Sequence, residues 1–219
     1  MAIRVDHRFV HTIFQETYLD LEMSNPGLKA PPAHLKELRR YTGAFDASEL
    51  GLEDSYSLLT LRTTGEIPVV YMCHTGRKHN TASEGIFIQS EGWKQGGEAL
   101  LEHFDDILGT TFYSEAEIDA FAAQGQVPAE ESSSVREIAP VPVDKTAIRA
   151  ILYATMLRWR QGTPQLHIAV PKAEMGRYND YVLGAVKTIW SYFPAYMRAA
   201  VGFVSYLSPA GSGTSPASR

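Results

Sequence analysis

The first half of the chain carries the patterns that are typical of β-strands, which are a loose alternation of apolar and polar positions and short apolar runs. Four runs carry such strand signals. They are residues 3–14, 55–63, 67–75 and 85–90. The segment around Gly65 is short, so the two runs beside it are predicted to pair as a hairpin. This half of the chain is therefore predicted to form an antiparallel sheet.

Helical spacing of the apolar residues begins in the middle of the chain. Residues 97–109 carry one apolar stripe, and Gly109 is expected to close this helix in the left-handed conformation. Ser114 stands three residues before Glu117, which is the spacing of a capping box, and Gly125 is expected to end the helix that this box opens. Both stretches are predicted to be helices.

Two longer helices are predicted after residue 143. Asp144 is the expected N-cap of the first, residues 145–161, because aspartate accepts hydrogen bonds from free backbone N–H groups at a helix start. The residues expected to face the core from this helix are Ile148, Ile151, Leu152, Thr155 and Trp159. Residues 178–193 are apolar nearly all round, which indicates a helix covered on both sides.

Two short alternating runs, residues 166–170 and 201–207, flank that second helix. A strand, helix and strand in this order predict a right-handed crossover and a parallel pair of strands. Phe203 alternates with Val201 and Ser205, so its side chain is expected in the core. The predicted fold class is α+β (mixed α/β), with a helix-rich second half that ends in this strand–helix–strand unit.

The composition changes at two further places. Residues 126–143 are rich in proline, serine and glutamate, and they are predicted to be an internal linker with a short edge strand at residues 135–138. Residues 208–219 lose all periodicity and are predicted to be a flexible tail or a linker to a further domain. We expect a single α+β domain over residues 1–207.

Charge and cysteine content narrow the functional classes. The 219 residues include 25 acidic and 20 basic side chains, for a net charge of −5, and the basic residues are scattered. A basic face for nucleic acid is therefore not expected. One cysteine excludes an internal disulfide and suits a reducing compartment. No uncharged apolar run is long enough to span a membrane, and the first residues lack the apolar core of a signal peptide. We expect a cytoplasmic protein.

The stretch VVYMCHTGRKHN, residues 69–80, concentrates the reactive side chains. Cys73 and His74 are neighbours in a predicted strand, so they belong to opposite faces of the sheet. A zinc site needs four converging ligands, and the next histidine, His79, lies six positions after Cys73, so no metal site is predicted. A cysteine nucleophile needs a base within hydrogen-bond reach. An inert core thiol is favoured, because free cysteine is among the most buried residue types.

Four polar residues, Arg77, Lys78, His79 and Asn80, follow Gly76 where the chain is expected to leave the sheet. They form either a solvated connection or a loop that recognises a partner, since loops on rigid scaffolds often carry binding. No phosphate-binding loop, dinucleotide-binding motif or nucleophile elbow is present. No catalytic residue is assigned and no cofactor is expected. Cys73, His74 and His79 are the catalytic candidates if this interpretation is wrong.

Two stretches together resemble the amino-terminal domain of bacterial GTPase-associated proteins. Residues 69–93 match its strand, its polar loop and a segment of the form G-apolar-x-apolar-x-S-x-G. Residues 166–208 match its closing block, which has a strand, a helix, a P-x-x-x-R turn and a final strand. In this chain the matching residues of the turn and final strand are Pro194, Arg198, Phe203, Ser205 and Tyr206.

The resemblance implies a domain that stands beside predicted GTPases in multi-gene bacterial conflict systems, usually ahead of further domains. It brings no catalytic residues. We therefore expect a non-catalytic adaptor or assembly module that binds a partner protein, with a GTPase as the implied partner. Two alternatives stay open: a hydrolase using Cys73 with His74 or His79, and a small-ligand sensor using the helix start after residues 169–176. The sequence does not indicate the oligomeric state.

Overall fold

The structure is a computed structural model, and the part of it that can be described covers nine stretches of the chain. They are residues 5–14, 17–22, 54–61, 67–74, 82–88, 99–109, 113–125, 136–161 and 168–205. Most of the residues with described side chains are helical, and the short strand β6 (Phe203–Val204) follows the last helix. The predicted tail at residues 208–219 and the first part of the predicted linker, residues 126–135, lie outside the described residues.

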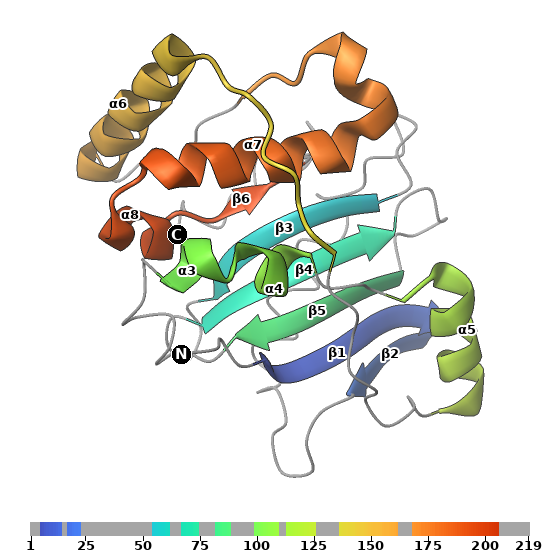
Figure 1. Cartoon of the computed structure of the whole chain (residues 1–219). Helices are drawn as coiled ribbons and strands as arrows, with labels where there is room; N and C mark the ends of the chain where they lie inside the picture. Colours follow the sequence, from blue (N-terminus) through green and yellow to red (C-terminus); the bar gives the residue numbers. More distant parts are fainter. Residues whose placement is uncertain are drawn as a thin grey trace.

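Six strands pair through their backbones into one sheet (Figure 1). The strands besides β6 are β1 (Val5–Phe14), β2 (Thr17–Glu22), β3 (Asp54–Leu61), β4 (Ile67–His74) and β5 (Ala82–Ile88). Their order is β2-β1-β5-β4-β3-β6, and each of the five pairings is antiparallel. β4 is an interior strand, with β5 on one side and β3 on the other.

The predicted pairing of residues 55–63 with residues 67–75 is confirmed, because β3 and β4 run antiparallel from Leu61↔Ile67 to Asp54↔His74. The predicted parallel pair is wrong. β6 joins β3 in the antiparallel direction, and residues 168–170 are irregular rather than a strand. Ile168 is exposed, and Pro171 directly precedes a 3₁₀ helix, so this segment leads into the helical layer instead of adding to the sheet.

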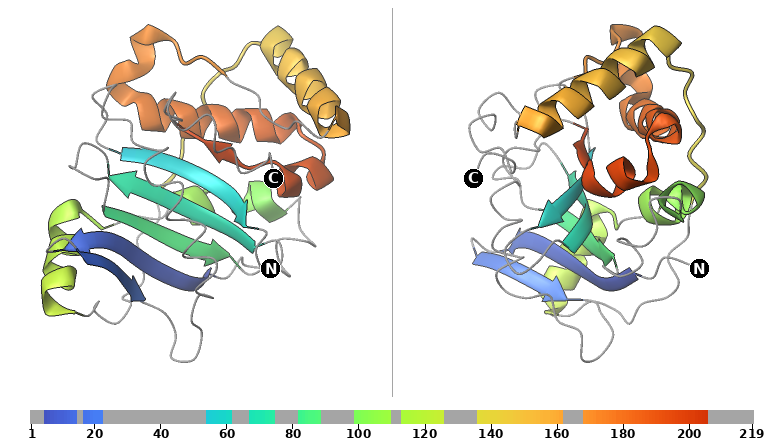
Figure 2. Two further views of the ribbon diagram at one scale, coloured as in Figure 1. Left: turned by 180° about the vertical axis from the view of Figure 1, so that it is seen from behind. Right: turned by 90° about the vertical axis from the view of Figure 1, so that its left-hand side faces the viewer.

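The helical elements are α3 (Ala99–Glu102), α4 (Phe104–Leu108), α5 (Glu115–Gln124), α6 (Lys145–Gln161), the 3₁₀ helix η3 (Lys172–Arg177), α7 (Tyr178–Tyr192) and α8 (Ala195–Ala200). Helices α3, α4, α7 and α8 lie together over one face of the sheet (Figures 1 and 2). Helix α5 lies beside β1 and β2, and α6 lies beyond α7 at the margin of the molecule (Figures 1 and 2).

The single helix predicted over residues 97–109 is interrupted at His103, where α3 ends and α4 begins. Gly109 has φ −86°, so the expected left-handed closing residue is also wrong. Glycine is required here for space, since a Cβ at this position would collide with the carbonyl oxygen of Arg136. That close approach carries a hydrogen bond of 2.9 Å from the Arg136 N–H to the Gly109 carbonyl oxygen.

The ends of α5 follow the prediction. The backbone N–H of Ser114 donates to the Glu117 carboxylate at 2.8 Å, and the Glu117 N–H lies 3.4 Å from the Ser114 hydroxyl that accepts its hydrogen bond. This is the reciprocal capping box that the spacing predicts. Gly125 closes the helix with φ 71°, in the left-handed region that a residue without Cβ enters freely.

One hydrophobic core joins β3 to the helices above it. Its buried members are Leu58, Phe104, Leu108, Ile138, Leu183, Ile189, Trp190, Phe193 and Met197. The rings of Phe104 and Trp190 meet edge to face, with their centroids 5.7 Å apart. α7 is buried at Tyr178 and Ile189 on one side and at Leu183 and Trp190 on the other, which confirms the prediction that it is covered on both sides. Phe203 packs against this core but is only partly buried.

Residues 136–144, which we name the strap, are the described part of the predicted linker and its junction with α6. The strap lies against α4 and α7, and Ile138 is buried in the core. The Ile138 N–H donates to Asp105 Oδ1 at 3.1 Å. The Val141 N–H donates to the Gly184 carbonyl oxygen at 3.2 Å, and Thr188 Oγ1 donates to the Val141 carbonyl oxygen at 2.7 Å. Residues 136–138 form no strand, so the edge strand predicted there is wrong over these residues.

Candidate functional site

The sequence-predicted site begins at the carboxyl end of β4. Cys73 pairs with Ser55 on β3 and with Ser83 on β5, and His74 pairs with Asp54 and Ala82. Because consecutive strand positions alternate between the two faces of a sheet, positions 73 and 74 lie on opposite faces. That placement disfavours a reaction in which His74 is the base for a Cys73 nucleophile, since base and nucleophile must be within hydrogen-bond reach.

On the face of the sheet that carries position 73, the neighbouring residues with described side chains are buried. Ser55, the described cross-strand neighbour of Cys73, is buried, and so is Ser57 on the same face of β3. Four loop residues lie outside the described residues: Arg77, Lys78, His79 and Asn80. The distance between Cys73 and His79 is therefore not described either. His74, at the end of β4, pairs with Ala82, at the start of β5. The two residues that flank this loop therefore lie side by side at one end of the strands.

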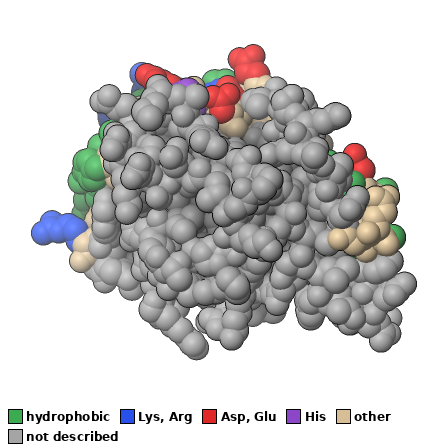
Figure 3. Space-filling view, turned by 90° about the horizontal axis from the view of Figure 1, so that it is seen from below, with side chains coloured by type: hydrophobic (Ala, Val, Ile, Leu, Met, Phe, Trp, Pro, Cys, Tyr) green, Lys and Arg blue, Asp and Glu red, His purple; other side chains and the backbone are tan. Residues whose placement is uncertain are grey.

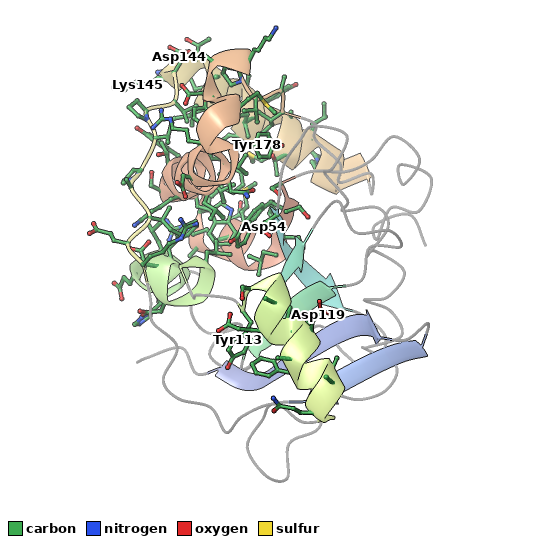
Figure 4. The ribbon with its side chains drawn as sticks, turned by 90° about the vertical axis from the view of Figure 1, so that its right-hand side faces the viewer. Asp54, Tyr113, Asp119, Asp144, Lys145 and Tyr178 are labelled. Atoms are coloured by element: carbon green, nitrogen blue, oxygen red, sulfur yellow. The ribbon has the colours of Figure 1, made fainter. Side chains whose placement is uncertain are left out.

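The start of α7 is fixed to the same end of the strands by polar groups. The Tyr178 hydroxyl donates to the Ser205 carbonyl oxygen at 2.5 Å, and Asn179 Nδ2 donates to the Asp54 carbonyl oxygen at 3.0 Å. The Ser205 hydroxyl accepts the Tyr56 N–H at 2.9 Å. Figure 4 labels Tyr178 and Asp54 on these two adjoining elements. These hydrogen bonds hold α7 on β3 and β6 at the helix start that was considered for a ligand sensor.

A second polar cluster fastens the strap to α4 and α7. Lys187 Nζ donates to both carboxylate oxygens of Asp105 at 2.8 Å and to the Ile138 carbonyl oxygen at 2.9 Å. The ammonium group also lies 5.8 Å from the centroid of the Phe104 ring, within the range of a cation–π contact. Every member of this cluster has a partner within it, so its geometry indicates a structural clip rather than a group that is free to react.

The pKa shifts resolved among the described residues belong to helix ends and the surface. Hydrogen bonds from the side chain and backbone of Ser114 lower the pKa of Glu117, and backbone N–H groups of Ala147 and Thr146 lower the pKa of Asp144. The neighbouring Glu174 carboxylate raises the pKa of Arg177. Each shift stabilises the charged form of a group that caps or pairs, which is a contribution to stability rather than a sign of acid–base catalysis.

Helix α6 presents a surface that sequence reasoning missed. Asp144 caps it as predicted, by accepting the N–H groups of Thr146 at 2.7 Å and Ala147 at 3.0 Å. Ile148 is buried, and Ile151 and Leu152 pack against the core, so the predicted inward stripe is confirmed at these positions. The strap leads directly into this helix, and Figure 4 shows Asp144 and Lys145 at its start.

The opposite side of α6 carries large apolar side chains in solvent. Tyr153 is 70% exposed, Met156 50% and Leu157 41%. Arg149 and Arg160 are also exposed, and together with Tyr153 and Met156 they follow the spacing i, i+4, i+7 and i+11 along one stripe. We name these five residues the α6 face. The spacing and the lack of any acidic residue between Lys145 and Gln161 are visible in the sequence and could have identified it.

Among the described residues, no group of three or more histidine, cysteine, aspartate or glutamate side chains is arranged to hold a metal ion. No helix within the described stretches has the length and apolar character needed to cross a membrane. No family model, curated protein or solved structure shows significant similarity to this chain.

Proposed function

We propose that this chain is a cytoplasmic, non-catalytic adaptor module that binds a partner protein, built as an α+β domain with an antiparallel amino-terminal half. The observation that carries the proposal is a set of large apolar side chains left in solvent by the helical layer. They are Tyr153, Met156, Leu157, Ile168, Tyr192 and Tyr196. Tyrosine, methionine and arginine are the residue types enriched at the centres of protein interfaces.

The exposed residues of α6, the end of α7 and α8 come from elements that lie on one side of the molecule (Figures 1 and 2). The space-filling view from below has a patch of hydrophobic side chains on that side, with a basic side chain projecting next to it (Figure 3). Scattered single apolar residues are normal on a protein surface, whereas several from neighbouring elements indicate a binding region. This grouping supports the adaptor function.

A second contact is proposed for the loop residues Arg77, Lys78, His79 and Asn80. β4, which leads into the loop, is an interior strand of the sheet, and a strand held on both sides gives a loop a rigid base. The partner class comes from the family resemblance in residues 69–93 and 166–208, which implies a GTPase of a bacterial conflict system. Cys73 takes no chemical part in this function.

The test starts by establishing whether a neighbouring gene encodes a GTPase. That GTPase is then co-purified with the chain, and the affinity is measured by isothermal titration calorimetry. We expect a dissociation constant in the range of about 1 μM or tighter, as for a specific interface. Arg77→Glu with Lys78→Glu should weaken binding by about tenfold at low salt, because opposite charges steer and fix the complex. Cys73→Ser is the matched control, and the protein that stays folded should bind like the wild type.

Two outcomes contradict the proposal. One is the absence of any complex with the GTPase. The other is a folded Cys73→Ser variant that loses activity in a cellular assay, because this result assigns the function to a nucleophilic thiol.

A further inference from the structure

We infer that the α6 face (Arg149, Tyr153, Met156, Leu157 and Arg160) docks an acidic amphipathic helix of a partner protein. The inference rests on the proposed adaptor function and deepens it by assigning a surface and a partner chemistry. The occupant would lay apolar side chains on Tyr153 and Met156 and place one carboxylate against each of the two arginines. Three observations favour this occupant over the others.

The first observation is the arrangement of apolar and charged positions. Tyr153 and Met156 lie at the centre of the stripe, and Arg149 and Arg160 lie at its two ends, eleven residues or about 16 Å apart along the helix axis. An apolar centre between charged ends is the usual anatomy of a protein interface. The spacing i, i+4, i+7 and i+11 is also that of a seam between two helices packed side by side.

The second observation is the charge of α6. The helix contains four basic residues and no acidic one, although the whole chain carries 25 acidic and 20 basic side chains. Some cations elsewhere in the helical layer form ion pairs, among them Arg136 with Asp180 at 2.6 Å and Lys187 with Asp105 at 2.8 Å. Arg149 and Arg160 form no ion pair with any described residue. Their charge is directed to solvent, where it can attract an acidic partner.

The same charge pattern argues against a second copy of this chain as the occupant. In an antiparallel pair of α6 helices, Arg149 of one copy would face Arg160 of the other. In a parallel pair each arginine would face its own counterpart. Either arrangement brings like charges together, which costs free energy at an interface, whereas an acidic helix satisfies both arginines.

The third observation concerns the orientation of the helix. The more apolar side of α6 (Ile148, Ile151 and Leu152) packs inward. Among the described side chains of this helix, Arg149 and Arg160 share the outer side with three large apolar residues. A helix that lies in a membrane surface needs the reverse, with a broad apolar face free to enter the lipid and its cations on the opposite side. A partner helix needs only a narrow apolar seam with charges at its ends.

The probe for the test is a synthetic, dye-labelled amphipathic peptide with two glutamates eleven positions apart and leucine and phenylalanine between them. Binding to the full chain is followed by fluorescence anisotropy. We expect saturable binding that Arg149→Glu with Arg160→Glu weakens at least about tenfold. A peptide with lysine in place of both glutamates should bind this double variant better than it binds the wild type. Such a charge swap cannot restore binding that was lost through unfolding.

Matched controls locate the site. Tyr153→Ala should weaken the peptide several-fold, while Lys172→Glu, an exposed charge reversal on η3, should leave binding within about twofold. Equal binding of the peptide to the wild type and to both sets of α6 variants overturns the inference. It is also overturned if the chain ignores the peptide but binds phosphatidylserine vesicles or a 20-nucleotide RNA through Arg149 and Arg160, or dimerises through Tyr153.

The inference and the proposed function can fail separately. If the wild type and the α6 variants bind the GTPase equally tightly, the result supports the adaptor function and contradicts the α6 docking site. If the peptide binds the α6 face and the GTPase does not bind the chain at all, the result supports the docking site and contradicts the GTPase as its partner.

Discussion

Helices α6 and α7 are similar in length, at 17 and 15 residues, but they use their side chains in opposite ways. α7 is covered by the sheet, α4 and the strap, and several of its polar groups form hydrogen bonds inside the molecule. Tyr178 and Asn179 donate to carbonyl groups at the ends of strands, and Lys187 donates to Asp105. α6 buries only one side and leaves aromatic, apolar and basic groups in solvent. The difference separates a helix that holds the fold from a helix whose outer side is exposed.

The largest expected effect comes from one leucine on each helix. Leu183 of α7 is fully buried, so Leu183→Ala should lower the free energy of unfolding by about 2–5 kcal/mol through lost burial and the cavity left behind. Leu157 of α6 is 41% exposed, and Leu157→Ala should change stability by about 0.5 kcal/mol or less. Chemical denaturation of the two variants measures both values. Equal losses would show that α6 is as much a part of the core as α7.

A pair of glycines tests the contact between α7 and the strap. A Cβ at Gly184 would collide with the carbonyl oxygen of Ala139 and lie 2.8 Å from Val141 Cγ2, so Gly184→Ala should cost about 1–3 kcal/mol as the strap is pushed away. Gly176 has no atom within 4 Å of the corresponding position, and Gly176→Ala should be neutral or slightly stabilising. Thermal unfolding distinguishes the two. A neutral Gly184→Ala variant would mean that the strap is not packed on α7.

The smallest expected effect concerns the cap of α6. Backbone N–H groups of Ala147 and Thr146 lower the pKa of Asp144 in the folded protein, so the cap stabilises α6 above the unfolded pKa of aspartate, near 4. This contribution is lost as the pH falls through the lower, folded pKa. Asp144→Asn keeps a capping oxygen that does not titrate. The thermal stability of the wild type relative to this variant should therefore decrease below about pH 4, and a constant difference would contradict the assigned cap.

Local patterns predicted the parts of the structure that local physics decides. The Ser114–Glu117 box, Gly125 and Asp144 are each set by backbone groups within four residues, and each is found as predicted. The apolar pattern of residues 178–193 likewise predicted a covered helix. Strand β2 was missed although Leu19 and Leu21 alternate with Asp20 and Glu22, because a run of only six residues gives a short signal.

Non-local contacts explain the errors. Gly109 has the sequence signature of a left-handed helix end, but the structure needs glycine there because the Arg136 carbonyl group approaches closely. The two residues are 27 positions apart, so local spacing does not reveal the contact. The strap has a linker composition, yet Ile138 and Val141 find partners on α4 and α7. The α6 face was overlooked for a different reason. The inward apolar stripe alone is enough to predict the helix, whereas Arg149, Tyr153, Met156 and Arg160 follow the same periodicity on the outward side.

Hydrogen exchange followed by mass spectrometry tests the contrast between α6 and α7 most directly, with the full chain alone and with the acidic amphipathic peptide. In the free chain, amides of α7 should exchange much more slowly than those of α6, because only the core helix must await extensive unfolding. Addition of the peptide should slow exchange in residues 145–161 and leave residues 178–192 unchanged. Equal protection of the two helices in the free chain, or slowing by the peptide that maps to residues 178–192 instead, would contradict the account.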